Sequence, residues 1–244
     1  MAEYVYGIVS GTSAPPSGHG IAGAPLHLIA GDGAAALVSD LPDDNLRLGR
    51  EEIVTHARVL EDALGRGTVL PMRFGVVLEG PEQVRERILE GHADELTEQL
   101  ERFAGKVEVN IRVLYEEEPL MREIVARDPQ IARLRSGLKG KPEDATYYDR
   151  IRLGELVAAA VERAREADAQ SILEVLSQHA LAAEVGEPPH ERVALSASFL
   201  VARERLGAFD AALEDIARGQ SGRMRFKYTG PLPPHSFVEL AGAG

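Results

Sequence analysis

One nearly apolar run, residues 69–78, constrains the fold of this chain more than any other stretch. Its sequence is VLPMRFGVVL, and Arg73 is its only charged residue, although 27% of all residues in the chain are charged. If the run is a strand, side chains alternate between its two faces. One face is then uninterrupted and apolar, which predicts contact with a core: Leu70, Met72, Phe74, Val76 and Leu78.

The opposite face of the same run is less regular, because it carries Val69, Pro71, Arg73, Gly75 and Val77. Proline cannot donate a hydrogen bond to a ladder, so Pro71 predicts a sheet edge or a bulge. Gly75 leaves room for another backbone to come close. Arg73 either pairs with a carboxylate of a neighbouring element or faces a partner, and both readings stay open. We take Pro71, Arg73, Gly75 and Val77 as candidate partner-binding residues.

Composition limits the function classes that this chain can serve. Its 244 residues suit one large or two small units. With 39 acidic and 27 basic residues the net charge is -12, which disfavours nucleic acids and anionic membranes as partners. No segment approaches the roughly 18 apolar residues of a membrane span, and the N-terminus lacks the features of a secretion signal. Without such a span, we expect a soluble protein. The absence of cysteine excludes disulfides and thiolate sites and fits a reducing compartment.

The first half of the chain reads as a mixed α+β unit. Residues 3–10 are rich in β-forming residues, and residues 26–38 predict a hairpin around the turn at Asp32-Gly33. Two helices are predicted, one over residues 49–67 and one over residues 81–105. The core-facing stripe expected for the first is Ile53, Ala57, Leu60 and Leu64; for the second it is Val84, Ile88, Leu96, Leu100 and Phe103.

The pattern restarts at Gly105. Residues 106–117 alternate apolar and polar side chains, which predicts a strand with one buried face, with Glu108 on the polar side. A helical segment from Pro119, a long helix from about residue 148 to 185, a strand, a short helix and a third strand follow. The fold class predicted is α+β with two domains. These are residues 1–105, an N-terminal α+β domain that is the candidate partner-binding unit, and residues 106–244, a ferredoxin-like domain with a proline-rich tail.

No catalytic, cofactor or metal site is predicted. GHGIAG at residues 18–23 has the letters of a dinucleotide-binding loop, but prolines flank it and no helix follows, so we read it as a mobile hairpin loop. The histidines at 19, 27, 56, 92, 179, 190 and 235 show no metal-ligand spacing. We interpret His56 and His92 as boundary residues of their helices. Acidic runs such as YEEEP are read as solvated, and no serine lies in a nucleophile elbow.

One signature and five further segments together resemble one protein family. TVLPMRFGVVL is similar to the LPmRFGT signature of the gas vesicle accessory proteins GvpF and GvpL. YVYGIV, AALVSDLP, ILEGHADELTEQLERFAGKVEVNIRV, RIRLGELVAAAVERA and the ending FKYTGPLPPHSFV follow the family in the same order. The departures are Val76, where threonine is common, and Leu232, where the family often has an aromatic residue, which puts any stacking by the tail in doubt.

The resemblance implies a non-enzymatic, cytoplasmic accessory protein of gas vesicle assembly. It implies binding to the hydrophobic shell protein GvpA, and contact with other gas vesicle accessory proteins is open. It also implies two α+β domains, the second a modified ferredoxin fold. Two alternatives remain. One is a small-molecule sensor with a pocket that uses His56, Arg73 or Tyr148, and the other is a scaffold that joins accessory proteins through the long helix and tail.

Overall fold

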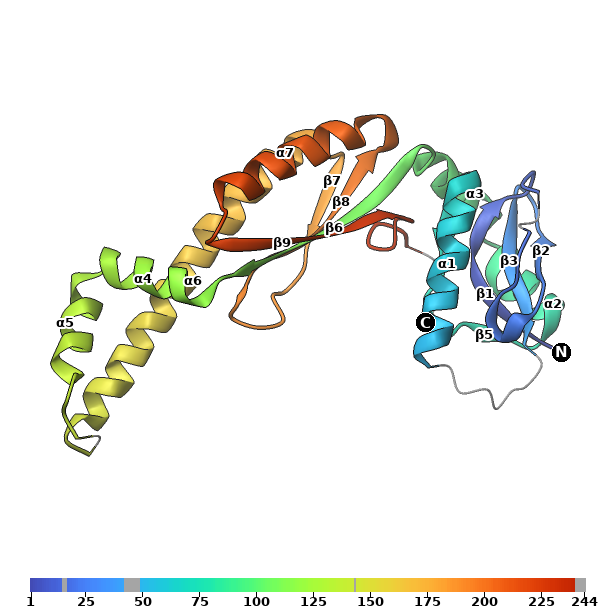
Figure 1. Ribbon diagram of the computed structural model, residues 1–244. Helices are drawn as coiled ribbons and strands as arrows, with labels where there is room; N and C mark the ends of the chain where they lie inside the picture. The colour runs from blue at the N-terminus through green and yellow to red at the C-terminus, as the bar shows by residue number, and fades with distance from the viewer. Residues whose placement is uncertain (15–16, 42–48, 143, 240–244) are drawn as a thin grey trace. The chain divides into compact units, whose positions relative to one another are not determined.

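A computed structural model describes residues 1–14, 17–41, 49–142 and 144–239. The chain forms two compact units. Figure 1 colours the chain from blue at the N-terminus to red at the C-terminus. The first comprises residues 1–109, 202–204 and the chain from 230 onward, and the second comprises residues 110–201 and 205–229. The division into domains 1–105 and 106–244 stays a prediction, because a compact unit is not thereby shown to fold by itself.

The first unit is built on a sheet with strand order β2-β3-β1-β4, in which β5 also pairs with β1. The strands are β1 (Ala2–Ser10), β2 (Leu26–Ala30), β3 (Ala34–Leu41), β4 (Val69–Pro71) and β5 (Val77–Leu78). All pairs are antiparallel. The predicted β2–β3 hairpin is confirmed, and its turn places Gly33 at a φ of 74°, where glycine has no steric penalty.

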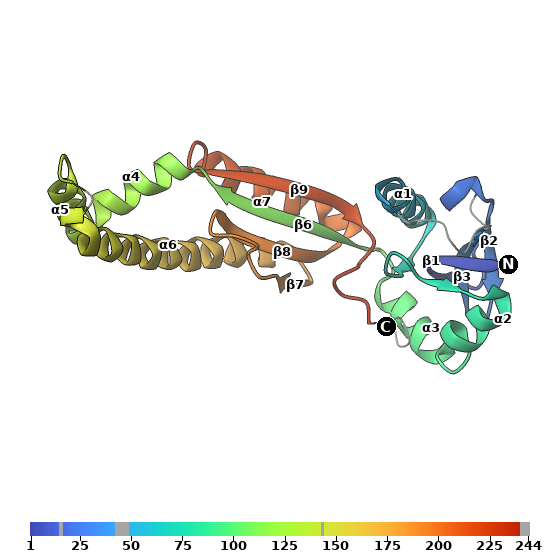
Figure 2. The same ribbon diagram turned by 90° about the horizontal axis from the view of Figure 1, so that it is seen from below.

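Helices cover both faces of this sheet (Figure 2). One face contacts α1 (Arg50–Arg66), and the other contacts α2 (Gly80–Val84), the π-helical turn η2 (Arg85–Leu89) and α3 (Ala93–Arg102). The short turn η1 (Ile21–Gly23) lies between β1 and β2 in the chain. The core is therefore a three-layer stack of helix, sheet and helix.

The stripe predicted for α1 is partly wrong. Ile53 is 51% exposed and Ala57 is exposed, whereas the buried residues are His56, Val59, Leu60, Ala63 and Leu64. The apolar spacing admits both stripes, and contact with β1 selects the one that contains His56. The histidine read as a boundary residue is in fact buried.

The second predicted helix is also interrupted. It breaks between η2 and α3, where Gly91 adopts a φ of 81°, a conformation that ends a helix. His92 therefore precedes α3 rather than lying within a continuous helix. The predicted core residues of this segment are confirmed as buried: Val84, Ile88, Leu96, Leu100 and Phe103.

The second sheet has the strand order β7-β8-β6-β9. Its strands are β6 (Lys106–Tyr115), β7 (Ala182–Val185), β8 (Val193–Ala202) and β9 (Met224–Leu232). The helices are α4 (Glu117–Arg127), α5 (Pro129–Leu138), α6 (Tyr147–Leu176) and α7 (Leu206–Gly219), with 3-10 turns η3 (Asp144–Thr146), η4 (Ser177–His179) and η5 (Arg203–Arg205). The order β6, helices, β7, β8, α7, β9 is the β-α-β-β-α-β arrangement of ferredoxin-like folds. The predicted α+β class with a long helix is confirmed.

Two predictions in this half of the chain are wrong. The long helix ends at Leu176, and Ala182–Val185 form the edge strand β7 rather than its last turn. Glu108 was placed on the polar side of its strand, yet it is 1% exposed. Its carboxylate accepts hydrogen bonds from Ser236 N–H at 2.7 Å and from the Ser236 hydroxyl at 2.9 Å. The tail is held a second time where Gln99 donates to the Glu239 carbonyl at 2.6 Å.

None of the described helices meets the requirements of a bilayer span. Even α6, which has 30 residues, does not combine sufficient length with sufficient apolar character to cross a membrane.

Candidate functional site

The run at residues 69–78 lies along one edge of the first sheet, but it is not a continuous strand. Gly7 pairs with Pro71 and Tyr4 pairs with Val77. Two further backbone hydrogen bonds to β1 flank residues 73–75. Met72 N–H donates to the Tyr6 carbonyl at 2.9 Å, and Val5 N–H donates to the Val76 carbonyl at 3.0 Å.

Because Tyr6 and Val5 are consecutive on β1, residues 73–75 have no partner positions on that strand. We call Arg73, Phe74 and Gly75 the edge bulge. All three are exposed, with Phe74 at 36%. Gly75 adopts a φ of 94°, which an L side chain rarely adopts, so glycine allows the turn of the bulge.

A buried network supports the edge bulge from below. Gly75 N–H donates to the Tyr4 hydroxyl at 3.0 Å, and that hydroxyl forms a hydrogen bond with His56 Nδ1 at 3.0 Å, in which the hydroxyl is the donor when the neutral ring carries its proton on Nε2. The Phe74 ring lies 5.7 Å from the His56 ring and 6.2 Å from the Tyr4 ring, measured between centroids. The bulge is therefore positioned by side chains of β1 and α1. Burial raises the pKa of Tyr4 to about 12, so its hydroxyl remains a donor at neutral pH.

The four predicted partner-binding residues differ in their placement. Pro71 is buried and ends β4 at the sheet edge, as proline at this position predicts. Gly75 and Arg73 are exposed in the edge bulge, and Val77 is 37% exposed on β5. Among the described residues, no carboxylate forms an ion pair with Arg73. The prediction that Arg73 pairs with a carboxylate of a neighbouring element therefore finds no such carboxylate within that part of the chain.

The residues of the sensor alternative come from different units. His56 and Arg73 belong to the first unit and Tyr148 to the second. A cavity of about 310 Å³ in the first unit is lined by other residues, among them Val9, Leu37 and Arg66. Tyr148 is 84% exposed on α6, and His56 is 5% exposed.

The GHGIAG segment is part of the packing beside β1. Ile21 is buried, and its N–H donates to the Tyr6 hydroxyl at 2.7 Å. Gly20 lies so close to that hydroxyl that a Cβ atom there would be 2.1 Å from it. The segment forms the 3-10 turn η1 and leads into β2, so no α-helix N-terminus follows it to receive a phosphate.

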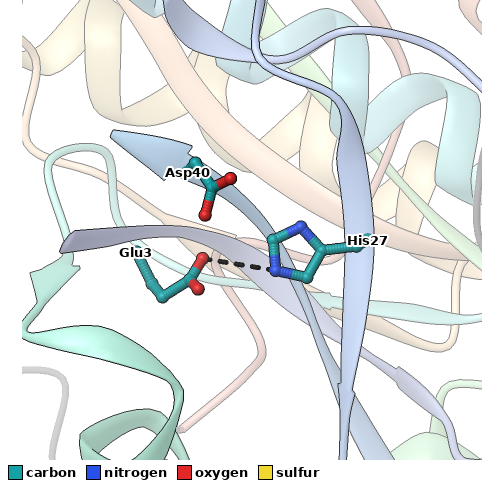
Figure 3. Close-up of side chains that lie close together, drawn as sticks. All are labelled: Glu3, His27 and Asp40. Carbon is teal, nitrogen blue, oxygen red and sulfur yellow. Dashed lines mark ion pairs between the residues drawn. The ribbon is translucent and has the colours of Figure 1, made fainter. Parts of the chain in front are cut away.

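Sequence reasoning did not bring together Glu3, His27 and Asp40, which lie on β1, β2 and β3. Figure 3 shows their side chains converging. Glu3 Oε2 lies 3.4 Å from His27 Nε2, and Glu3 is 4% exposed. No sequence spacing could have found this cluster, because cross-strand pairing alone assembles it.

The second unit contains a polar network centred on Arg223. This side chain forms ion pairs with Glu123 at 2.6 Å and with Asp168 at 2.7 Å. The Tyr115 hydroxyl donates to Asp168 at 2.6 Å, and Arg223 lies over the Tyr115 ring. The network joins β6, α4 and α6 to the residue preceding β9. Burial raises the pKa of Tyr115, with the charge of Asp168 acting in the same direction. The polar network around Arg223 stabilises the second unit.

Taken together, these features define an α+β protein of two units whose candidate site is an exposed sheet edge rather than an enclosed pocket. A family model described as gas vesicle synthesis protein GvpL/GvpF matches residues 2–239. The chain therefore belongs to the GvpL/GvpF family.

Relatives and solved structures agree with this assignment. Gas vesicle protein F of Streptomyces sp. (strain CB03234) is 35% identical over 243 residues, covering 98% of this chain and 100% of that protein. The crystal structure of the gas vesicle protein GvpF from Anabaena sp. PCC7120 matches with a TM-score of 0.85 at 23% identity, covering 98% of this chain and 99% of that one. GvpF from Microcystis aeruginosa matches with a TM-score of 0.80 at 25% identity and the same coverage.

Proposed function

We propose that this protein is a non-enzymatic accessory protein of gas vesicle assembly that binds the hydrophobic shell protein GvpA through the edge bulge and β5. In this proposal it acts in the cytoplasm and at the growing gas vesicle, and it assists nucleation or formation of the shell. Membership of the GvpL/GvpF family supports the general role. The binding surface rests on the geometry of the sheet edge.

One observation carries the proposal: two apolar side chains are exposed beside an arginine that has no ion pair among the described residues. Phe74 and Val77 are 36% and 37% exposed, on either side of Gly75. They lie at the outer edge of the first sheet, where β5, among the residues that the structure describes, has strand partners on one side only, namely Glu3 and Tyr4 of β1. An open strand edge with apolar neighbours is a surface on which another chain can pair or pack.

The chemistry of the two partners is complementary. A shell subunit with an apolar face is an aggregation hazard before it polymerises, so it needs a temporary cover. The edge bulge and β5 would cover part of such a face, and Arg73 supplies a directional charged contact at its margin. The net charge of -12 on this chain would keep the complex in solution.

The experiment is co-expression of the full-length chain with GvpA, followed by affinity capture of the chain and quantification of the GvpA recovered. Three variants are compared with the wild type: Arg73→Ala, Val77→Asp and the matched control Val185→Asp. Val185 is 56% exposed on the edge strand β7 of the second unit, so the control places the same charge on another sheet edge. Circular dichroism checks that each variant is folded.

We expect the two first-unit variants to lower GvpA recovery several-fold while Val185→Asp retains it. A loss of recovery in Val185→Asp alone would assign the binding to the second unit and contradict the proposed surface. Wild-type recovery in both Arg73→Ala and Val77→Asp would also contradict it.

A further inference from the structure

Three strands of the first sheet bring one histidine and two carboxylates to the same face. Glu3 on β1 lies directly opposite Asp40 on β3. His27 on β2 lies opposite Val38, which is two residues before Asp40 on β3. Side chains two apart on a strand share a face, so His27, Asp40 and Glu3 point to the same side. Figure 3 shows the imidazole and both carboxylates turned toward one another.

The arrangement brings two carboxylates and one imidazole close together. Two carboxylates directly opposite on neighbouring strands repel each other. Glu3 is 4% exposed, and the one polar contact of its Oε2 atom among the described residues is the ion pair with His27 Nε2 at 3.4 Å, whose geometry is poor for a hydrogen bond. A buried carboxylate oxygen without a hydrogen bond is costly. Burial raises the pKa of the Glu3 carboxyl, and the charge of Asp40 raises it further while His27 lowers it.

We propose that Glu3, His27 and Asp40 form a binding site for a divalent first-row transition-metal ion such as Zn²⁺. Imidazole and carboxylate are ligands that zinc accepts, whereas Ca²⁺ and Mg²⁺ prefer sets composed only of oxygen. One ligand atom from each residue lies within 4.8 Å of the other two. The site is distinct from the edge bulge and is not part of the proposed GvpA surface.

The distances suit such an ion. Bonds of about 2.1 Å in a tetrahedral zinc site separate neighbouring ligand atoms by about 3.4 Å. Glu3 Oε2 and His27 Nε2 are already 3.4 Å apart. Asp40 is half-buried, and its ligand atom lies within 4.8 Å of the other two, so its side chain would have to move closer to complete the third ligand position. The His27 side chain is 41% exposed, which leaves a path for the ion and a position for water.

A metal ion bound by Glu3, His27 and Asp40 would connect strands β1, β2 and β3. β2 is the outermost strand of the sheet and otherwise pairs only with β3 among the described residues. An ion held by His27 and Glu3 would tie β2 to β1 across β3. The expected effect is a folded state that metal stabilises, because the ion binds the folded chain and not the unfolded one.

The test is titration of the full-length, untagged protein with Zn²⁺, using calorimetry for stoichiometry and thermal unfolding for stability. His27→Gln and Asp40→Asn each remove one ligand with little change in side-chain size. His92→Gln is the control, because His92 also has a carboxylate neighbour, Glu95 at 3.7 Å, but is not part of the cluster. Ca²⁺ and Mg²⁺ are titrated in parallel.

We expect one Zn²⁺ per chain and a rise in Tm for the wild type and for His92→Gln. Each ligand variant should bind at least about tenfold more weakly and lose the rise in Tm. Equal Zn²⁺ affinity in His27→Gln and the wild type would overturn the site, as would a Tm rise from Ca²⁺ or Mg²⁺ as large as that from Zn²⁺. No stoichiometric binding to the wild type would show that the cluster is a simple ion pair. In zinc-soaked crystals, an anomalous peak among the three side chains would support the site independently.

Discussion

Acid should destabilise the first unit through His56. The Tyr4 hydroxyl accepts a hydrogen bond from Gly75 N–H and donates its own hydrogen to His56 Nδ1. The neutral ring therefore carries its proton on Nε2, which is buried. Burial, with a further contribution from the charge of His235, lowers the pKa of His56 from 6.5 to about 4, although a hydrogen bond with the Met72 backbone acts in the opposite direction. Protonation at Nδ1 would remove the acceptor on which the Tyr4 hydroxyl depends.

The magnitude follows from the difference between the folded and unfolded pKa values. The unfolded chain takes up this proton near the ordinary pKa of 6.5, whereas the folded chain takes it up only near 4. The full contribution to stability is thus present above about pH 6.5, falls as the pH decreases toward 4, and is constant below that. At about 1.36 kcal/mol per unit of pKa, the loss is about 2 kcal/mol at pH 5 and about 3 kcal/mol below pH 4.

Urea unfolding at about pH 7.5 and about pH 5 measures this loss. The informative variant is His56→Asn, because asparagine keeps an acceptor close to the position of Nδ1 but does not titrate. This variant will be less stable at both pH values, so the quantity compared is the change with pH. The wild type should lose about 2 kcal/mol more than His56→Asn. His190→Asn, which changes an exposed histidine, should retain the wild-type pH dependence. Equal losses in the wild type and His56→Asn would refute the reasoning.

Four further variants, one of them a control, test other parts of the fold by urea unfolding. Arg223→Met should cost about 3–5 kcal/mol, because it leaves the largely buried Asp168 carboxylate without its cation, whereas Glu123 keeps its ion pair with Arg127; a cost near zero would contradict the network. Gly75→Ala should cost about 1–2 kcal/mol because its φ is 94°. The control Gly65→Ala should stabilise by up to about 1 kcal/mol, since a Cβ atom there meets nothing within 4 Å. Arg73→Ala should change stability by less than about 0.5 kcal/mol, and a loss of several kcal/mol would indicate a partner for this arginine.

Periodicity predicted the type of most elements from the sequence. It predicted the β2–β3 hairpin, the strand β6 and the buried residues of the segment that contains α3. It failed where local preference and tertiary pairing disagree. Ala182–Val185 follow an Ala-rich helix and contain residues that favour helices, yet pairing with β8 makes them a strand.

The run at residues 69–78 is a second case in which strand pairing overrides the local sequence pattern. Alternation correctly predicted that Leu70 and Met72 are buried, and then failed at Phe74 because the edge bulge shifts the register. Gly75 indicates that another backbone can come close at this position. A single glycine does not, however, specify how many residues lose their hydrogen-bonded pairing with β1. The cluster of Glu3, His27 and Asp40 was beyond sequence reasoning, because its members come together only through strand register.

The tail contacts have a consequence for biosynthesis. Gln99 and Glu108, in the first unit, find partners in residues 236–239, which lie 140 and 128 positions later in the chain. During translation the buried carboxylate of Glu108 therefore lacks the hydrogen bonds that Ser236 donates in the finished protein. The first unit cannot complete its packing until residues 236–239 have left the ribosome, long after its first hundred residues have emerged. A fragment that stops at the predicted boundary would lack these contacts in the same way, so the packing of the first unit depends on residues from a distant part of the chain.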